Sequence, residues 1–318
     1  MVYISVILIT ARPEYKVIGQ SDESWLKATL RLLSEQTFWD FELIIVDSLY
    51  GTREYDFQDE PFIVQHVPVH PNHRIWLDRK RYNICGSLNT ALMYAEGEII
   101  VRMDDCCEPD KDYLQRIYDE YQRGFWLQGM HIRYRDGKPS VNSEGVINQD
   151  SRIDIVKANG GRVLGPPEWM YGHATFPLEA ALKVNGFDEL FDGDKQQEDQ
   201  DFGSRLVMAG YRDKILVDSR HTIIEHEHKA IPSDIIDPTH PQIKCNYAIY
   251  MRSLNLNRWR VNEELLSVDD IKFIKEETLR APCSTVNHTY ADNCEGELFQ
   301  QWIDSQHLFN LREMRLEI

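Results

Sequence analysis

This sequence lacks an excess of positive charge, and it lacks long apolar runs. Its 318 residues include 35 Lys and Arg against 52 Asp and Glu, so the formal net charge at pH 7 is −17. Nucleic-acid-binding proteins gain affinity from clustered Lys and Arg, so this charge argues against a nucleic-acid partner. The apolar segment Val2 to Thr10 is too short to span a bilayer and has no cationic leader. We expect a cytoplasmic protein without a transmembrane segment, with peripheral membrane association left open.

Cysteine is also scarce and shows no metal-binding or redox spacing. The six cysteines contain no CxxC pair, and the neighbours Cys106 and Cys107 are poorly placed to bridge each other. Reduced thiols are therefore expected. In a reducing compartment, the sequon that begins at Asn287 carries no meaning.

Glycine-based signatures are missing as well. No predicted strand is followed by G-x-x-x-x-G-K-[ST] or G-x-G-x-x-G, and no G-x-S-x-G occurs. These absences argue against kinase, dinucleotide-binding and α/β-hydrolase functions. An acidic protein can nevertheless hold one diphosphate through a divalent cation on a few carboxylates, so a nucleotide-sugar remains compatible with the charge.

Short apolar runs that alternate with helical patterns predict a parallel α/β sheet in the first hundred residues. The predicted strands are 4–10, 41–46, 62–67 and 98–103, and the predicted helices are 24–36, 82–95 and 112–121. In such sheets the ligand crevice lies at the carboxyl ends of the strands. Asp47 and Asp104 both follow a predicted strand and so fall at that edge.

The pattern changes near residue 125, where glycines begin to separate short apolar runs. The later elements are predicted as helices 178–186 and 198–210, strands 214–217 and 222–224, and mostly helical sequence beyond 240. No internal repeat or low-complexity tract occurs. The length suits one large α/β domain or two smaller units that share an interface.

Two adjacent carboxylates, Asp104 and Asp105, leave a predicted strand at the expected crevice. Hard divalent cations prefer carboxylate oxygens and keep substrate phosphates among their ligands, so this pair could bridge Mn²⁺ or Mg²⁺ to a diphosphate. Acidic residues also cap turns after strands, and the pair alone does not decide between these roles.

Two further polar segments have a functional and a structural interpretation. Asp199 lies in an acidic run that begins a predicted helix, where the helix dipole alone would explain it. An ionised carboxylate there could also accept the proton of an attacking hydroxyl, which makes Asp199 a candidate base. His226 and His228 would share one face of an extended segment and suit a metal such as Mn²⁺, although single histidines are more often structural.

Taken together, these segments resemble glycosyltransferase family 2, whose members have the GT-A fold. The similarity runs through about residues 3 to 230 in the family's order, including Met103-Asp104-Asp105, the segment 184–189, Glu198-Asp199 and His226. One departure is Cys106, which stands where the family has its second metal-binding aspartate. Either Asp105 takes its place or metal binding is altered.

The resemblance implies an α/β GT-A fold with a doubly wound, mostly parallel sheet, an acceptor-side α+β half and a helical C-terminal extension. Residues 1–125 would be the nucleotide-sugar-binding half, 126–235 the acceptor-binding and catalytic half, and 236–318 the extension. The implied reaction is metal-dependent inverting transfer of a sugar from a nucleotide-diphosphate donor, expected to be a UDP-sugar, to a hydroxyl of a glycan or other acceptor. Mn²⁺ or Mg²⁺ would be the cofactor.

The resemblance also assigns roles to individual residues. Asp199 would be the catalytic base. Donor-binding residues would be Thr10, Arg12, Asp47, Asn89 and Asp104. Metal ligands would be Asp104, Asp105 and His226, and acceptor-binding residues would be Trp169, Gly172 and Glu198. For Trp169, core packing is an equally good explanation, because tryptophan buries a large area in any globular domain.

Two other functions remain open at this point. A sugar nucleotidyltransferase shares the fold class, but it should show an early glycine-rich loop with a basic residue, which the segment 10–15 does not provide. A non-catalytic carbohydrate-binding or scaffold protein could keep the fold without the chemistry. Cys106 leaves that alternative open.

Overall fold

The chain folds into two compact units that interleave along the sequence. Unit 1 comprises Met1–Pro68, Ala95–Glu179 and Tyr211–Ala230, and unit 2 comprises Val69–Tyr94, Ala180–Gly210 and Ile231–Ile318. The computed structural model describes residues 2–11, 25–52, 57, 59–165, 170, 172–226, 243–280 and 296–318. The sequence predicted three continuous segments, 1–125, 126–235 and 236–318. The two units are instead each made of several stretches of the chain, and the division into three segments stays a prediction.

Unit 1 contains both sheets of the described chain. Its strands are β1 (Ile4–Thr10), β2 (Phe41–Asp47), β3 (Ile63–Pro68), β4 (Ile99–Asp104), β5 (Cys107–Glu108), β6 (Trp126–Arg135), β7 (Lys138–Pro139), β8 (Arg162–Leu164), β9 (Thr175–Pro177) and β10 (Ile215–His226). Its helices are α1 (Trp25–Ser34), α3 (Tyr113–Gln122), α4 (Arg152–Ala158) and η5 (Arg212–Lys214). Helix α5 (Leu178–Lys183) begins in this unit and ends in unit 2.

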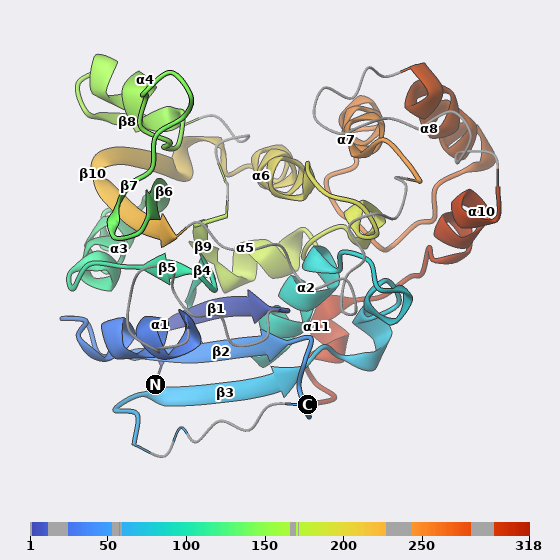
Figure 1. Ribbon diagram of the computed structural model, residues 1–318. Coiled ribbons are helices and arrows are strands. Elements are labelled where there is room, and N and C mark those ends of the chain that lie inside the picture. Colours follow the sequence, from blue (N-terminus) through green and yellow to red (C-terminus); the bar gives the residue numbers. More distant parts are fainter. Residues whose placement is uncertain are drawn as a thin grey trace. The chain divides into compact units, whose positions relative to one another are not determined.

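The first sheet has the strand order β3-β2-β1-β4-β9, and its first four strands are mutually parallel (Figure 1). The short strand β9 is antiparallel to β4. Parallel pairing of β1 with both β2 and β4 brings the carboxyl ends of all three strands to one edge. The predicted parallel α/β sheet is therefore confirmed.

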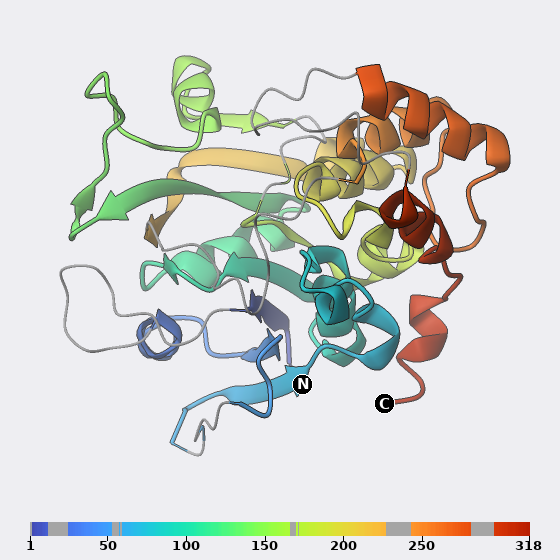
Figure 2. The same cartoon turned by 45° about the vertical axis from the view of Figure 1, so that its right-hand side comes forward.

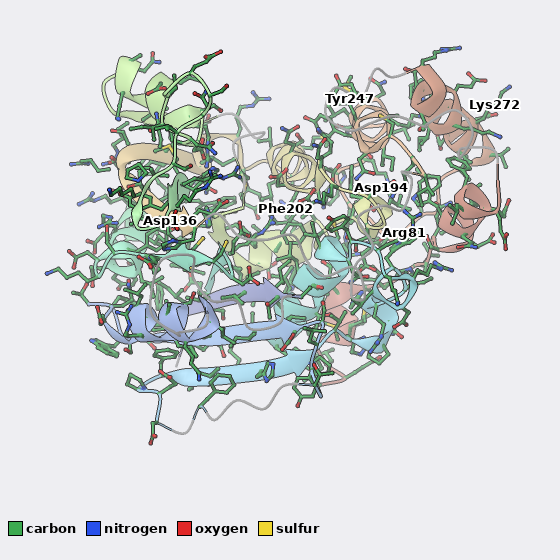
Figure 3. The ribbon with its side chains drawn as sticks, viewed as in Figure 1. Arg81, Asp136, Asp194, Phe202, Tyr247 and Lys272 are labelled. Carbon is green, nitrogen blue, oxygen red and sulfur yellow. The ribbon has the colours of Figure 1, made fainter. Side chains whose placement is uncertain are left out.

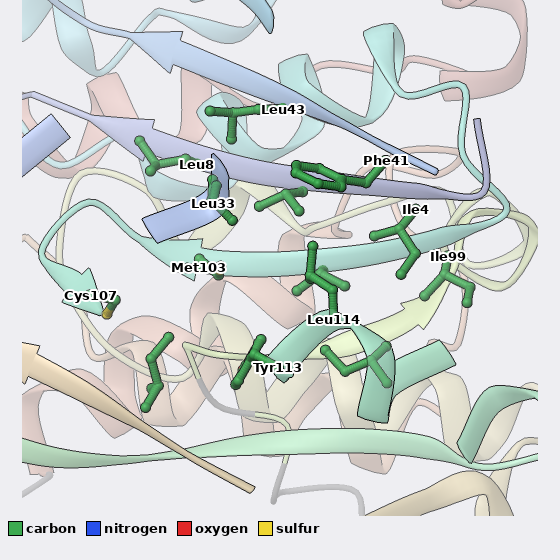
Figure 4. Packing of buried hydrophobic residues seen from close by; sticks show 14 of the residues in the cluster. Ile4, Leu8, Leu33, Phe41, Leu43, Ile99, Met103, Cys107, Tyr113 and Leu114 are labelled. Carbon is green, nitrogen blue, oxygen red and sulfur yellow. The ribbon is translucent and has the colours of Figure 1, made fainter. Parts of the chain in front are cut away.

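The core of unit 1 lies between the first sheet and two helices. Alternate residues of β1 point to one face of the sheet, where they pack against α1 and α3. Figure 4 shows Leu8 of β1 near Leu33 of α1, with Leu114 of α3 in the same cluster. Strands β1 and β2 are buried on both faces. They therefore contain nearly continuous apolar runs, as parallel strands usually do.

A buried carboxylate links the three central strands. Glu42 of β2 accepts hydrogen bonds from Ser5 Oγ of β1 at 2.6 Å and from the backbone N of Glu96 at 2.7 Å. The N–H of Gly97 donates to Ser5 Oγ at 2.8 Å. A Cβ atom on Gly97 would lie 2.5 Å from the Ser5 backbone nitrogen, so only glycine fits this approach to β1.

The second sheet has the order β5-β10-β6-β7, with β8 also paired to β10. Strands β6 and β10 run parallel to each other and lie side by side in Figures 1 and 2. The two strands predicted at 214–217 and 222–224 are one continuous strand, β10, whose pairing with β6 shifts register between Val217 and Thr222. The residues Asp218 to Arg220 are polar and resemble a turn, so the sequence predicted two strands in place of one.

Unit 2 is mostly helical. Its elements are η1 (Pro71–His73), η2 (Leu77–Arg79), α2 (Ile84–Tyr94), η4 (Glu189–Phe191), α6 (Glu198–Met208), α7 (Asn246–Asn255), α8 (Val268–Arg280), α10 (Glu297–Asp304) and α11 (Leu311–Met314). The Asp192 carboxylate accepts the N–H groups of Cys85 and Gly86, both at 2.8 Å, in the first turn of α2. Arg81 and Asp194, labelled in Figure 3, form a buried ion pair at 3.6 Å. The expected helical C-terminal extension is confirmed.

The sequence also led to expectations about the cysteines and about transmembrane helices. Cys85, Cys106, Cys107 and Cys245 are buried, and the reduced state of the six thiols stays a prediction. Among the residues that the structure describes, no helix has both the length and the apolar character needed to cross a membrane.

The acidic start of α6 yields a stability prediction. Asp201 is buried, and its Oδ2 accepts a hydrogen bond from Arg205 Nε at 2.6 Å, whereas the side chain of Asp199 is partly exposed. Asp201→Ala would leave the buried guanidinium without this partner. We expect it to lower the free energy of unfolding in urea by about 3–5 kcal/mol, and Asp199→Ala to lower it by about 1 kcal/mol or less. Equal losses in the two variants would contradict this account of α6.

Candidate functional site

The carboxyl edge of the first sheet brings several predicted donor-binding residues together. Thr10, the last residue of β1, is the register partner of Asp47 at the end of β2. On the other side of β1, Ile9 is the register partner of Asp104 at the end of β4. Thr10 and Asp47 are thus level with each other, and Asp104 lies level with the preceding residue of β1, so all three are at the carboxyl edge where the sequence predicted Asp47 and Asp104.

Asp104 and Asp105 face different surroundings at this edge. The side chain of Asp104 is 37% exposed, and its carboxylate lies against Gly172, where an added Cβ would be 3.1 Å from Oδ2. Asp105 is buried, and its Oδ2 accepts a hydrogen bond from Thr10 Oγ1 at 2.7 Å. Asp104 thus offers an accessible carboxylate beside a predicted acceptor-binding residue, while Asp105 links the ends of two strands.

Asp47 is the most enclosed acid of this edge. Its Oδ1 accepts the N–H of Leu49 at 2.8 Å, and its Oδ2 lies 3.0 Å from His66 Nε2. The predicted contact of Asp47 with a base or ribose stays a prediction.

His226 ends β10, and its Nε2 lies 2.8 Å from Glu108 Oε1 of β5. The hydrogen bond from His226 lowers the pKa of Glu108 and outweighs the opposing effect of burial. Asp104, Asp105 and His226 do not form a joint cluster among the described groups whose ligand atoms lie within 4.8 Å of one another. Their role as common metal ligands stays a prediction.

Another polar cluster lies next to Asp104. His131 of β6, His173 and Glu225 of β10 have ligand atoms within 4.8 Å of one another. His173 Nε2 is 3.8 Å from Glu225 Oε2 and 4.0 Å from Asp104 Oδ2. His131 Nδ1 is 3.5 Å from the same Glu225 oxygen. The second sheet thus supplies one imidazole and a carboxylate, and the segment before β9 supplies a second imidazole, beside the accessible acid of the first sheet.

The charge states of this cluster follow from burial and from neighbouring charges. Burial raises the pKa of Glu225, but His173, His131 and Arg133 more than offset it and bring the value to about 2. Burial lowers the pKa of His131, although Glu225 partly opposes that shift. Near pH 7, Glu225 is therefore ionised and His131 is neutral, which are the forms that bind metal ions.

The other described candidates belong to unit 2. Asn89 is buried; its Nδ2 donates to the carbonyl of Phe187 at 2.9 Å, and its Oδ1 accepts the N–H of Phe187 at 2.8 Å. Glu198 and Asp199 occupy the first turn of α6 and are partly exposed, and Asp199 Oδ1 accepts the N–H of Gln200 at 2.8 Å. Their donor, acceptor and base roles stay predictions.

Three predicted residues cannot be placed. Arg12, Trp169 and His228 lie outside the described residues.

Sequence reasoning in turn missed the cluster of His131, His173 and Glu225, because its members come from three separate segments and form no spacing motif. The sequence did contain one indication, which is that polar residues occur within strands where apolar residues are usual. His131 follows the apolar start of β6, and Glu225 follows the run Thr222 to Ile224.

Comparisons with known proteins bear on family and fold. The model for glycosyl transferase family 2 matches residues 17–159 of this chain. No curated protein matches it. The structure of S. aureus TarS 1-349 in complex with UDP-GlcNAc is similar at a TM-score of 0.51 and 15% identity, over 95% of this chain and 79% of that one. The structure of S. aureus TarS is similar at a TM-score of 0.50 and 14% identity, over 99% of this chain and 53% of that one.

At this low identity, the likeness to TarS concerns the fold alone. The family match covers β2, β3 and β4, two of which end in Asp47 and Asp104, and it continues into the second sheet. Sequence match, parallel sheet and acidic edge agree with one another. The chain has the GT-A fold and is similar to glycosyl transferase family 2 over residues 17–159.

Proposed function

We propose that this chain is a metal-dependent, inverting glycosyltransferase that moves a hexosyl group from a UDP-sugar to a hydroxyl of a glycan or another acceptor. The observation that carries the proposal is the shared edge where Thr10, Asp47 and Asp104 end adjacent parallel strands. The match of residues 17–159 to the model for glycosyl transferase family 2 supports it. The similar fold of TarS, a protein solved in complex with UDP-GlcNAc, supports the choice of donor. Both substrates and the enzyme would meet in the cytoplasm.

The nucleotide would bind at the carboxyl ends of the strands, where open α/β sheets hold their ligands. Asp104 has the accessible carboxylate of this edge, so it faces the diphosphate end of the donor. Asp47 and Thr10 lie further along the same edge and suit the nucleoside end. Gly172 approaches Asp104 closely, and a side chain there would displace the carboxylate.

A divalent cation fits the chemistry of this edge. The Asp104 carboxylate supplies a hard oxygen ligand, whereas Asp105 and His226 would have to rearrange, because they contact Thr10 and Glu108. When bound, Mn²⁺ or Mg²⁺ would neutralise the charge that develops on the departing nucleoside diphosphate. The chain's own part is to hold the ion beside the donor.

Asp199 is the proposed general base. The acceptor hydroxyl oxygen would attack the anomeric carbon, the bond from that carbon to the diphosphate oxygen would break, and the hydroxyl proton would pass to Asp199. One displacement inverts the anomeric configuration. The first turn of α6 favours the ionised carboxylate through the helix dipole. Glu198, Gly172 and Trp169 are the proposed acceptor contacts.

Asp199→Asn tests the base. The amide keeps the size of the side chain but cannot accept the proton, so kcat for transfer should fall by about 10²–10⁴-fold. Binding of UDP measured by calorimetry should change little. Asp154→Asn, at an exposed position of α4, serves as the matched acid-to-amide control and should retain wild-type turnover. Unchanged kcat in Asp199→Asn would remove this residue as the base.

Asp104→Asn tests the donor site. Loss of the accessible carboxylate should weaken UDP-sugar binding in the presence of Mn²⁺ by about tenfold or more, equivalent to ~1.4 kcal/mol. Without Mn²⁺, the variant and the wild type should bind the donor about equally. Release of UDP from the wild type, followed with and without Mn²⁺, provides the decisive control. A chain that releases no UDP under either condition would be a carbohydrate-binding protein instead of a transferase.

A further inference from the structure

We propose that His131, His173 and Glu225 form a binding site for a divalent transition-metal ion in unit 1. This site differs from the ligand set predicted from the family resemblance, which was Asp104, Asp105 and His226. It does not rest on the proposed transfer reaction, because the binding of an ion can be measured without substrate.

The fold brings these three residues together from separate segments. Strands β6 and β10 are parallel, and His131 is the register partner of Ile223. Glu225 lies two residues further along β10 and therefore on the same face of the sheet as Ile223. His173 comes from the segment before β9, where its carbonyl accepts the N–H of Gly129 of β6 at 2.9 Å. Strand pairing thus fixes the positions of all three.

The distances suit ligands of one ion better than they suit direct hydrogen bonds. His131 Nδ1 and His173 Nε2 lie 3.5 and 3.8 Å from the same oxygen, Glu225 Oε2. Nitrogen and oxygen ligands about 2.1 Å from a metal ion lie roughly 3–4 Å from one another. Both distances to Glu225 Oε2 fall in this range, and the three ligand atoms lie within 4.8 Å of one another.

A neighbouring group orients one of these ligands. Arg133 Nε donates to Glu225 Oε1 at 3.1 Å, which leaves Oε2 directed toward the imidazoles. A contact of this kind fixes the orientation of a metal ligand and raises its affinity.

The cluster is buried at one end and accessible at the other. The side chains of His173 and Glu225 are 2% and 10% exposed, whereas that of His131 is 21% exposed. Asp104, with Oδ2 4.0 Å from His173 Nε2, is the accessible acid beside it. An ion held by the three ligands would keep open positions on the side of Asp104 for water or a phosphate oxygen.

The ligand types select the metal. Two imidazole nitrogens and one carboxylate suit Mn²⁺, Fe²⁺, Co²⁺ or Zn²⁺. Mg²⁺ and Ca²⁺ prefer oxygen ligands alone. The site should therefore bind Zn²⁺ and Co²⁺ more tightly than Mg²⁺.

A second cluster in unit 2, made of His73, Glu189 and His307, has a different character. His73 Nδ1 lies 2.5 Å from Glu189 Oε1, which is a direct hydrogen-bond distance, and Asn89 Nδ2 donates to the same oxygen at 2.8 Å. These contacts satisfy the buried carboxylate without an ion. His307 is partly exposed, so substituting it provides a matched control.

The experiment uses the full chain after treatment with a chelator. Co²⁺ is titrated in, its visible absorption is recorded, and bound metal is counted after dialysis. We expect one Co²⁺ per wild-type chain, with His173→Gln, Glu225→Gln and His131→Asn each weakening binding by at least about tenfold. His307→Gln should bind like the wild type. Zn²⁺ should raise the Tm of the wild type and of His307→Gln more than Mg²⁺ does, and the three cluster variants should lose this difference.

Several results would overturn the proposal. These are absence of bound Co²⁺ in the wild type, wild-type affinity in the cluster variants, and loss of the ion in His307→Gln. His131→Asn protects the test against unfolding, because its side chain is the least buried of the three, and circular dichroism verifies the fold of each variant. A chain that binds the ion as expected but releases no UDP from a UDP-sugar would refute the proposed function and leave the metal site standing.

Discussion

The register between β1 and its two parallel neighbours determines where every acidic group of the first sheet lies. A slip by one residue would turn the side chains of a strand to the opposite face. Both faces of these strands are apolar and buried, so the hydrophobic pattern alone specifies register weakly. The buried Glu42 carboxylate adds specificity, because a slip of one residue would separate it from Ser5 Oγ and the Glu96 N–H, which donate to it in this alignment. The positions of Thr10, Asp47 and Asp104 at one edge depend on that alignment.

The charges around the cluster of His131, His173 and Glu225 do not balance. Two carboxylates beside the imidazole pair have guanidinium partners: Glu225 is paired with Arg133, and Asp150 with Arg152. His173 is buried and His131 is mostly buried. Burial lowers the pKa of His131 and so favours its neutral form. Negative charge therefore prevails where Asp104 meets this cluster. The described side chains leave this negative charge uncompensated. A divalent cation bound there, alone or together with a diphosphate, would compensate it.

The sequence predicted the first sheet and the edge where its acids gather, because short apolar runs ending in Asp47 and Asp104 encode both. It predicted α6 from its acidic start and the glycine after it. It did not predict the continuity of β10, since the polar segment after Val217 resembles a turn. The His131, His173 and Glu225 cluster depends on strand pairing between distant segments, and no local pattern encodes such pairing.

Cys106 connects these two halves of the site. In the family pattern its position carries an aspartate that binds the metal, and here a buried thiol replaces the oxygen ligand. The strand edge then keeps Asp104 as its accessible acid, while Asp105 is joined to Thr10. If the proposed ion binds at His131, His173 and Glu225, its two imidazole nitrogens would shift the preference from hard ions toward transition metals. The proposed transferase would then use an ion whose ligands come from β6, from β10 and from the segment before β9.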